Sequence, residues 1–130
     1  MFDTTIDIVA RTVYGEARNQ DRTGQKAVAH VIFNRAAKHY AGGLIAAVCL
    51  MPKQFSCWND GDPNRKLILH VGPDDNNFRQ CMIAVLEAMG EPDFTFGSSH
   101  YHTALVSPSW SKDKTPCYVH GDHLFFNNIT

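Results

Sequence analysis

The chain has 130 residues, of which 44% are hydrophobic and 19% are charged, and these proportions are typical of one compact globular domain. Twelve Lys and Arg residues against thirteen Asp and Glu residues give a formal net charge of -1, which argues against nucleic acid or an anionic membrane surface as a partner. No apolar stretch approaches the roughly 20 residues that a membrane-spanning helix requires. We therefore expect residues 1–130 to form a single monomeric domain without stable membrane insertion.

The N-terminal part of the chain predicts two helices. Apolar residues recur every three or four positions over 5–18, and the Asp and Thr side chains of residues 3–5 can cap the first turn of this helix. After a polar loop, Thr23 can cap a second helix over 24–39. Its AVAHVIF segment is apolar nearly all round, which predicts a central helix against which the others pack.

The middle of the chain predicts a short helix followed by an irregular segment. Gly42 and Gly43 precede the apolar segment LIAAVCL, which predicts a helix that ends before Pro52. Residues 54–71 contain Gly, Pro and several Asp and Asn residues, which predict a long surface segment that forms one wall of a cleft.

A further helix is predicted after this segment. Pro73 suits its first turn, and Gly90 with Pro92 ends it. The apolar stripe that should face the core consists of Phe78, Met82, Val85, Leu86 and Met89.

The composition changes after residue 93. Segments 93–106 and 114–126 are rich in aromatic and β-branched residues, and the polar sequence SPSWSKD separates them, which predicts two strands in a hairpin or small sheet. Helices first and strands last predict an α+β domain, with a small C-terminal antiparallel sheet beside a helical body.

Four cysteines occur without a C-x-x-C pair or a regular spacing. Cys49 and Cys81 fall among apolar helical residues, where a free thiol behaves as a small hydrophobic group. Buried free cysteines are therefore favoured, and a bridge between Cys57 and Cys117 stays open.

Glutamate is scarce in this sequence and occurs only at positions 16, 87 and 91. Glu87 lies on a predicted helix and Glu91 just after its end, where solvated carboxylates are common. Glu16 lies about 75 degrees from the centre of the apolar stripe of the first helix, at the edge of the core. Partial removal from water there favours the protonated form that a general acid needs. From periodicity alone, an ion pair with Arg11 or Arg18 is the more common role for such an acid.

Five motifs cover nearly the whole chain: VYGEAR at 13–18, TGQKAVAHVIFNRA at 23–36, QFS at 54–56 followed by Trp58, SSHYHT at 98–103 before Trp110, and GDHLFF at 121–126. In these motifs and in their order, the sequence resembles the SleB/CwlJ family of cell wall hydrolases, which includes spore cortex-lytic enzymes and related phage lysins. Five matches in the same order argue against a chance likeness.

The resemblance implies a lysozyme-like fold, a peptidoglycan substrate and Glu16 as the catalytic acid. It also implies cleavage between N-acetylmuramic acid and N-acetylglucosamine by a lytic transglycosylase, in which the 6-hydroxyl of the sugar attacks the anomeric carbon and leaves a 1,6-anhydro end. That reaction needs one carboxyl group and no cofactor, whereas retaining and inverting glycosidases normally use two carboxyl groups. Asp60 and Asp62 lie in the predicted irregular segment, so hydrolysis by water, as in a muramidase, stays open.

Sugar rings stack on aromatic side chains, and their hydroxyl groups bond to amides, hydroxyls and imidazoles. On this basis the best candidates to line a substrate groove are Tyr14, Gln54, Ser56, Tyr101, His102, Trp110 and His123.

The C-terminal histidines permit an alternative. His100 and His102 are two residues apart on a predicted strand and share a face, and His120 and His123 lie on or near the next strand. Four such imidazoles could hold zinc, which would favour an N-acetylmuramoyl-L-alanine amidase, although this spacing is permissive rather than diagnostic. We expect no metal. A wall-binding structural module of a phage particle without turnover is a further alternative, against which the retained Glu16 argues.

The first residues lack the basic start and apolar core of a signal peptide. We therefore expect synthesis in the cytoplasm, with action on the cell wall after release or delivery, as in phage lysis or on a phage particle.

Overall fold

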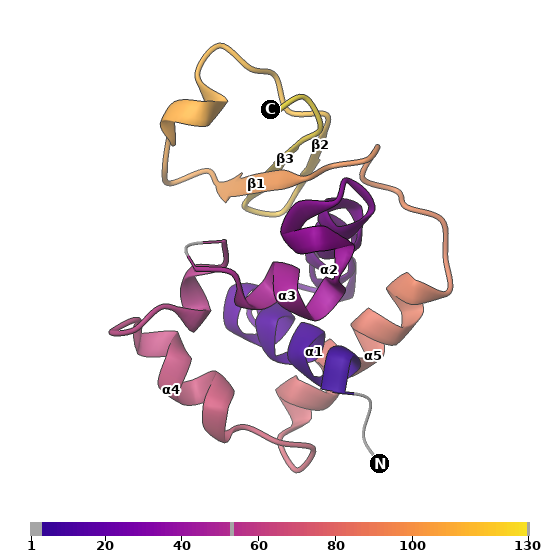
Figure 1. Ribbon diagram of the computed structural model, residues 1–130, viewed down its shortest axis with the longest axis vertical. Coiled ribbons are helices and arrows are strands. Elements are labelled where there is room, and N and C mark those ends of the chain that lie inside the picture. The colour runs from indigo at the N-terminus through magenta and orange to yellow at the C-terminus, as the bar shows by residue number, and fades with distance from the viewer. Residues whose placement is uncertain (1–3, 53, 130) are drawn as a thin grey trace.

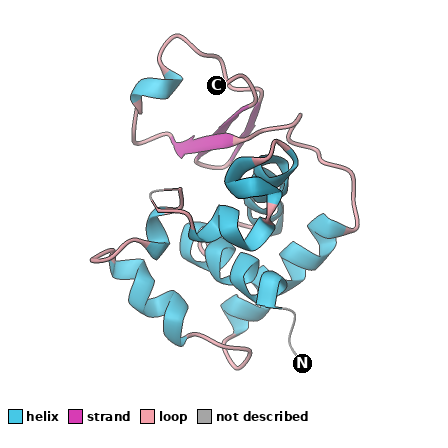
Figure 2. Ribbon diagram, in the orientation of Figure 1, coloured by secondary structure: helices cyan, strands magenta, loops and turns pink. Residues whose placement is uncertain are grey.

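The computed structural model describes residues 4–52 and 54–129. Its helical body is built on α1 (Thr4–Ala17), α2 (Arg22–Ala37) and α5 (Asn76–Met89), which pack against one another. Figure 1 shows the sheet at one end of this body, next to α2, and Figure 2 shows that the strands are confined to that end. No helix in the described part of the chain is both long and apolar enough to cross a membrane.

The two sides of α2 explain its nearly continuous apolar sequence. Val28 and Ile32 belong to the main core between the helices, whereas Ala27 and Val31 form a second cluster with Phe125 of the sheet. All five side chains are fully buried. The prediction of a central helix is confirmed, because α2 is the layer that joins the helical core to the sheet.

The helix starts differ from the sequence-based predictions. The N-cap of α2 is Asp21 instead of Thr23, and its carboxylate accepts a hydrogen bond from Gly24 N at 2.9 Å. Likewise α5 begins at Asn76, capped by Asp75, instead of near Pro73. The α1 helix begins at Thr4, and its candidate cap Asp3 lies outside the described residues.

The buried face of α5 was predicted only in part. Phe78 and Val85 are buried as expected, but Leu86 and Met89 are 49% and 55% exposed. The buried face of α5 includes small residues instead of Leu86 and Met89, because α1 and α2 approach α5 closely along this face. The buried residues of the helix are Phe78, Cys81, Ala84, Val85 and Ala88.

The middle of the chain contains more helix than the sequence predicted. The predicted short helix is confirmed as α3 (Ile45–Leu50), which follows the 3-10 turn Tyr40–Gly43. The expectation of an irregular segment over 54–71 is wrong, because α4 (Pro63–His70) and the 3-10 turn η2 (Ser56–Trp58) lie within it.

The residues that were interpreted as loop signals there are the start of α4. Pro63 occupies the first turn of the helix, and the carboxylate of Asp62 accepts a hydrogen bond from Asn64 N at 2.8 Å. Asp followed by Pro is a helix-start pattern as well as a loop pattern. Ile68 is the one buried residue of α4, so the apolar periodicity was weak.

The sheet has three strands, one more than predicted, in the order β1-β3-β2 with antiparallel pairing. They are β1 (His100–Thr103), β2 (Tyr118–His120) and β3 (His123–Phe126). The second predicted strand divides because Gly121 adopts a positive φ of 56°, and the chain turns back between β2 and β3. The 3-10 turn Ser109–Ser111 lies in the β1–β2 connection.

The cysteines do not pair. Cys49, Cys57 and Cys81 are buried and Cys117 is half-buried, and all four thiols are free. The bridge between Cys57 and Cys117 that the sequence left open is therefore not formed. Burial raises the pKa of the Cys49 thiol to about 11 and that of Cys81 to about 12, so both stay protonated as hydrophobic core groups.

Replacement of Asp21 tests the junction between helices and sheet. Asp21→Ala removes the α2 cap and the contact at 2.7 Å between the Asp21 carboxylate and His120 Nε2 of β2. We expect a loss of about 1 kcal/mol in the free energy of unfolding, measured by urea titration at neutral pH. Asp74→Ala, at an exposed position before α5, is the matched control. Equal stability of the two variants would contradict this role of Asp21.

Candidate active site

Glu16 lies near the C-terminal end of α1, where α1, η2 and β1 meet. One carboxylate oxygen accepts a hydrogen bond from the hydroxyl of Tyr101 at 2.6 Å. The other oxygen lies 3.4 Å from the backbone nitrogen of Cys57, whose N–H donates to it. Two segments that are distant in the sequence thus supply donors to one half-buried carboxyl group.

Gly15 makes this arrangement possible. A Cβ atom at residue 15 would lie 2.6 Å from Cys57 Cβ and 2.8 Å from Cys57 Sγ, far inside van der Waals contact. Because both clashing atoms are close to the backbone of a buried residue, a side chain at position 15 would push η2 away from Glu16. The Gly-Glu pair in the sequence therefore reflects a close approach of η2 to α1.

Glu16 differs from the other two glutamates in its partners. Glu87 pairs with Arg22 at 2.8 Å, and Glu91 pairs with Lys26 at 3.1 Å. The hydrogen bonds to Glu16 come instead from a neutral hydroxyl and a backbone amide.

The two arginines that could have paired with Glu16 are engaged elsewhere. Arg11 binds Asp7 and the carbonyl oxygens of Ile68 and Val71. Arg18 donates to Asn64 Oδ1 at 2.8 Å and approaches backbone carbonyls of its own helix. The carboxyl group of Glu16 is therefore held in place without being neutralised by an adjacent arginine.

Tyr101 is a neutral donor over the whole physiological pH range. Removal from water raises its pKa well above the ordinary value, and the charge of Glu16 and the hydrogen bond to it raise it further. Its ring packs against His123 and Phe125, with centroid separations of 5.1 and 5.6 Å. The packing fixes the hydroxyl group that points at Glu16.

A polar pocket of about 240 Å³ opens beside Glu16. Arg18, Asn19 and Asn64 line it with Gly15 and Glu16, so Glu16 is the one carboxylate among its five lining residues. Sequence reasoning missed these three polar residues. Asn64 could not be placed without α4, and Arg18 and Asn19 carried no pattern that separates a pocket wall from an ordinary helix end.

The two candidate second acids have other contacts. Asp62 caps α4, as described above. The Asp60 side chain is 96% exposed and lies 3.4 Å from Arg65 Nη1. Neither lines the pocket beside Glu16.

The predicted groove residues divide into four groups. Ser56 is exposed in η2, directly before Cys57, and Gln54 precedes this turn, so both lie on the segment that contacts Glu16. Tyr101 and His123 lie on the sheet face toward Glu16. Tyr14 is buried against Phe78 and lines a separate hollow beside α4.

His102 and Trp110 lie on the opposite face of the sheet. Side chains alternate along a strand, so His102 faces away from Tyr101. Its ring stacks on Phe126 at 5.3 Å, and Trp110 packs edge-on against both rings. The sequence predicted one groove from residues that the structure places on both faces of the sheet, at η2 and in a separate hollow beside α4.

The four C-terminal histidines do not converge. His100 and His102 share the outer face with Trp110, His123 faces Tyr101, and His120 Nε2 binds Asp21. In the described ranges, no group of three His, Cys, Asp or Glu side chains is arranged to hold a metal ion. The donor set that a zinc amidase would need is not assembled from these residues.

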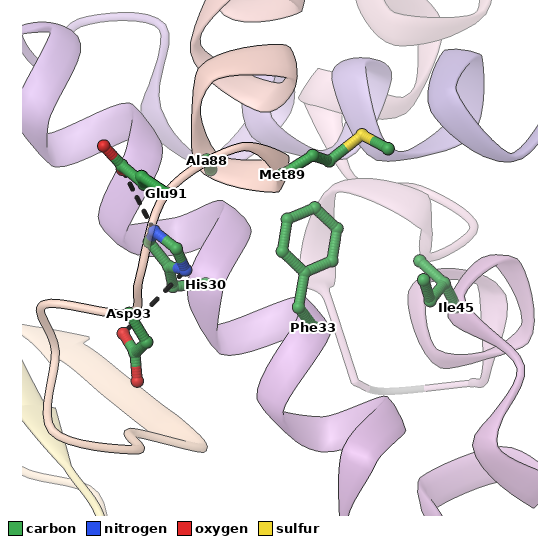
Figure 3. Close-up of a pocket in the computed structure, with 7 residues that line it drawn as sticks. All are labelled: His30, Phe33, Ile45, Ala88, Met89, Glu91 and Asp93. Carbon is green, nitrogen blue, oxygen red and sulfur yellow. Dashed lines mark hydrogen bonds and ion pairs between the residues drawn. The ribbon is translucent and has the colours of Figure 1, made fainter.

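A further hollow, of about 380 Å³, lies between α2, α3 and the end of α5 and is lined partly by His30, Phe33, Met89 and Asp93 (Figure 3). His30 is buried there, with Nε2 3.1 Å from Glu91 Oε1, which confirms the expected hydrogen-bonded core histidine. Its other ring nitrogen lies 3.9 Å from Asp93 Oδ1. These contacts tie the α5–β1 connection to α2, which is a structural role.

Acidification should weaken the sheet end of the molecule. Burial, followed by the positive charges of Arg35 and Lys38, lowers the pKa of His100 to about 4 from its ordinary value of 6.5. Because the folded state favours the neutral ring, its contribution to stability is complete above about pH 6.5 and is lost as pH falls towards about 4. Burial also lowers the pKa of His123, which acts in the same direction.

We therefore expect the free energy of unfolding to decrease across this window, and to decrease less in His100→Gln. Urea titrations at several pH values between about 7 and 4 measure both slopes. His70→Gln, at an exposed position of α4, is the control. Parallel loss of stability in the wild type and in His100→Gln would rule out this assignment.

Comparison with known proteins is consistent across sequence and fold. Residues 19–126 match the Cell Wall Hydrolase family, a range that begins just after Glu16. A spore cortex-lytic enzyme of Halalkalibacterium halodurans is 32% identical over 128 residues, which is 96% of this chain. One from Oceanobacillus iheyensis is 38% identical over 92% of this chain. This chain covers 35% and 40% of those two proteins, so it spans less than half their length.

Two solved structures share the fold. The catalytic domain of Bacillus cereus SleB superposes with a TM-score of 0.79 over 97% of this chain and 91% of that domain. The catalytic domain of the germination-specific lytic transglycosylase SleB from Bacillus anthracis gives a TM-score of 0.78 over 97% and 96%. Both are 24% identical to this chain. The expected lysozyme-like α+β architecture, with its small C-terminal antiparallel sheet, is confirmed.

Proposed function

This chain belongs to the cell wall hydrolase family, and on that premise we propose that it degrades peptidoglycan by cutting the glycan strand between N-acetylmuramic acid and N-acetylglucosamine. The observation that carries the proposal is the Glu16 carboxyl group, held by Tyr101 and Cys57 at the wall of a polar pocket. An acid that protonates a departing sugar oxygen must be fixed in position and open to substrate on one side. Glu16 meets both conditions.

The two hydrogen bonds to Glu16 suit the two stages of the reaction. The short Tyr101 contact fixes one oxygen firmly, whereas the 3.4 Å contact from Cys57 N is at the weak end of hydrogen-bond geometry. The weakly held oxygen is the one that can carry the proton to the glycosidic oxygen as the C–O bond breaks. After transfer, both donors stabilise the carboxylate that remains.

We propose the lytic transglycosylase outcome over hydrolysis. The Glu16 carboxylate takes the proton of the substrate's 6-hydroxyl as that oxygen attacks the anomeric carbon, so the acid is regenerated and a 1,6-anhydro ring forms. The support is the pocket, where Glu16 is the one carboxylate among the lining residues, with Asp60 and Asp62 engaged at α4. A glycosidase that uses water normally needs a second carboxyl group near the bond.

The rest of the pocket suits a polar sugar. Asn19 and Asn64 present amide groups, and Arg18 presents a guanidinium whose Cζ lies 5.2 Å from the centroid of the Tyr14 ring. Amides and guanidinium groups are matched to the hydroxyl, acetamido and lactyl oxygens of a glycan strand. Ser56 in η2 and Gln54 just before it lie on the segment that donates to Glu16, and we propose that they contact the adjoining sugar.

Two further points are proposals about the setting of the enzyme. We propose that the domain acts as a monomer on the glycan strands. We also propose that it reaches the wall after release or delivery, as a phage lysin or a particle-associated enzyme does.

Replacement of the acid tests the role of Glu16. Glu16→Gln keeps the size and polarity of the side chain but cannot transfer a proton at neutral pH. We expect the release of soluble fragments from purified sacculi to fall by at least about 100-fold, with thermal unfolding close to that of the wild type. Glu87→Gln, which alters an exposed ion pair, is the matched control and should keep full activity. Wild-type rates in Glu16→Gln would exclude the proposal.

The products decide the reaction type. Digestion of sacculi followed by mass spectrometry should give muropeptides with 1,6-anhydro ends, each lighter by one water than the hydrolysed equivalent. Fragments with reducing ends would instead establish hydrolysis. Free peptides with intact glycan strands would indicate an amidase, and binding to sacculi without any product would indicate a wall-binding module.

A further inference from the structure

We propose that Arg35 of α2 is a positioning residue that holds, from one point in the core, both segments that deliver hydrogen-bond donors to Glu16. Arg35 does not line the Glu16 pocket, so it acts through these segments instead of touching the substrate. The inference rests on the proposed role of Glu16 as the acid.

The first segment is the start of β1. Arg35 Nε donates a hydrogen bond to the carbonyl oxygen of Ser99 at 2.6 Å, and this bond is buried. Ser99 directly precedes β1, and the side chain of Tyr101 follows two residues later. Since residues two apart on a strand point to the same face, fixing Ser99 fixes the height and direction of the Tyr101 hydroxyl.

The second segment leads into η2. Arg35 Nη1 lies 3.4 Å from Gln54 Oε1 and donates to it, and the guanidinium group lies 4.7 Å from the centroid of the Phe55 ring. Phe55 is fully buried and stands two residues before Cys57, whose backbone N–H faces Glu16. The same side chain therefore fixes the approach of both donors.

The cost of burying Arg35 argues for such a role. Arg35 is only 6% exposed. It donates hydrogen bonds to the carbonyl oxygen of Ser99 and to the side-chain amide oxygen of Gln54. Within the described residues, no carboxylate is bound to it. A buried cation without a bound counter-charge gives little net stability compared with a hydrophobic residue of similar volume. The rigid fork of a guanidinium, however, can hold two segments at once.

Arg35 also supplies charge. Burial lowers its pKa, and the negative charges that Tyr101, Tyr40 and Glu16 can carry oppose that effect. An arginine stays protonated in proteins, so Arg35 presents a fixed positive charge on the core side of Glu16. This charge favours the carboxylate that remains after Glu16 has given up its proton.

Two substitutions separate geometry from charge. Arg35→Lys keeps the cation but loses the fork, so we expect kcat on soluble glycan fragments to fall roughly 10- to 100-fold, with little change in KM and in the alkaline limb of the pH profile. Arg35→Met removes the cation as well, so we expect a similar fall in kcat and a shift of the alkaline limb, where Glu16 loses its proton, to higher pH. Arg22→Met, on the exposed side of α2, is the control and should leave all three unchanged.

Wild-type kcat in a folded Arg35→Lys variant would overturn the proposal, and this variant decides the question if Arg35→Met does not fold. Tyr101→Phe supplies an independent measure, because positioning through Tyr101 predicts that Arg35→Lys costs much less in that background than in the wild type. If the losses of kcat from Arg35→Lys and Tyr101→Phe were simply additive in the double variant, this would count against positioning through Tyr101. Activity in Glu16→Gln would refute the proposed function itself, whereas an inactive Glu16→Gln with unaffected Arg35 variants would refute only this inference.

Discussion

The hydrogen bond between the Tyr101 hydroxyl and the Glu16 carboxylate is the constraint around which the molecule is organised. It joins the end of α1 to β1 across 85 residues of sequence, with a 2.6 Å separation that leaves little freedom in either element. The bond can form only if the sheet docks at a fixed height on the helical body. That docking is achieved by Phe125 of β3, which packs with Ala27 and Val31 of α2 in a cluster separate from the main core.

Polar side chains of α2 fix the docked sheet by bonding to the chain between α5 and β1. His30 contacts Glu91, Asn34 donates to Asp93 and to the carbonyl oxygen of Ser98, and Arg35 donates to the carbonyl oxygen of Ser99. Together they fasten the whole connection from α5 to β1 along one helix. His30 and Arg35 are buried, so their polar groups must be paired, and their geometric demands specify one arrangement where apolar packing alone would accept several. A helix that looks like simple core in the sequence is thus also the frame of the candidate site.

Much of the fold followed from local pattern, and the errors have local causes. Periodicity placed α1, α2, α3 and α5 correctly within a few residues, because each buries a continuous apolar face. The missed helix, α4, buries one residue, and its Asp-Pro start was taken for a loop. The extra strand arose because Gly121 allows a turn that divides one aromatic segment in two. Caps shifted from Thr23 to Asp21 because several polar residues near a helix start can fill the same role.

The sequence by itself determined the family motifs, the helical body with a C-terminal sheet, and Glu16 as the acid of interest, since a motif and a helical face are local properties. Only the tertiary structure decided which groups reach that acid. Tyr101 was among the candidates, but Cys57 acts through a backbone N–H that no side-chain pattern marks, and Gly15 matters because of a neighbour 42 positions away. Asn64 lies on α4, a helix that the sequence did not predict. Arg35 lies on α2, which the sequence indicated as a core helix. Hydrogen-bond partners depend on distances between elements, and periodicity gives the face of a helix or strand without naming what it will meet.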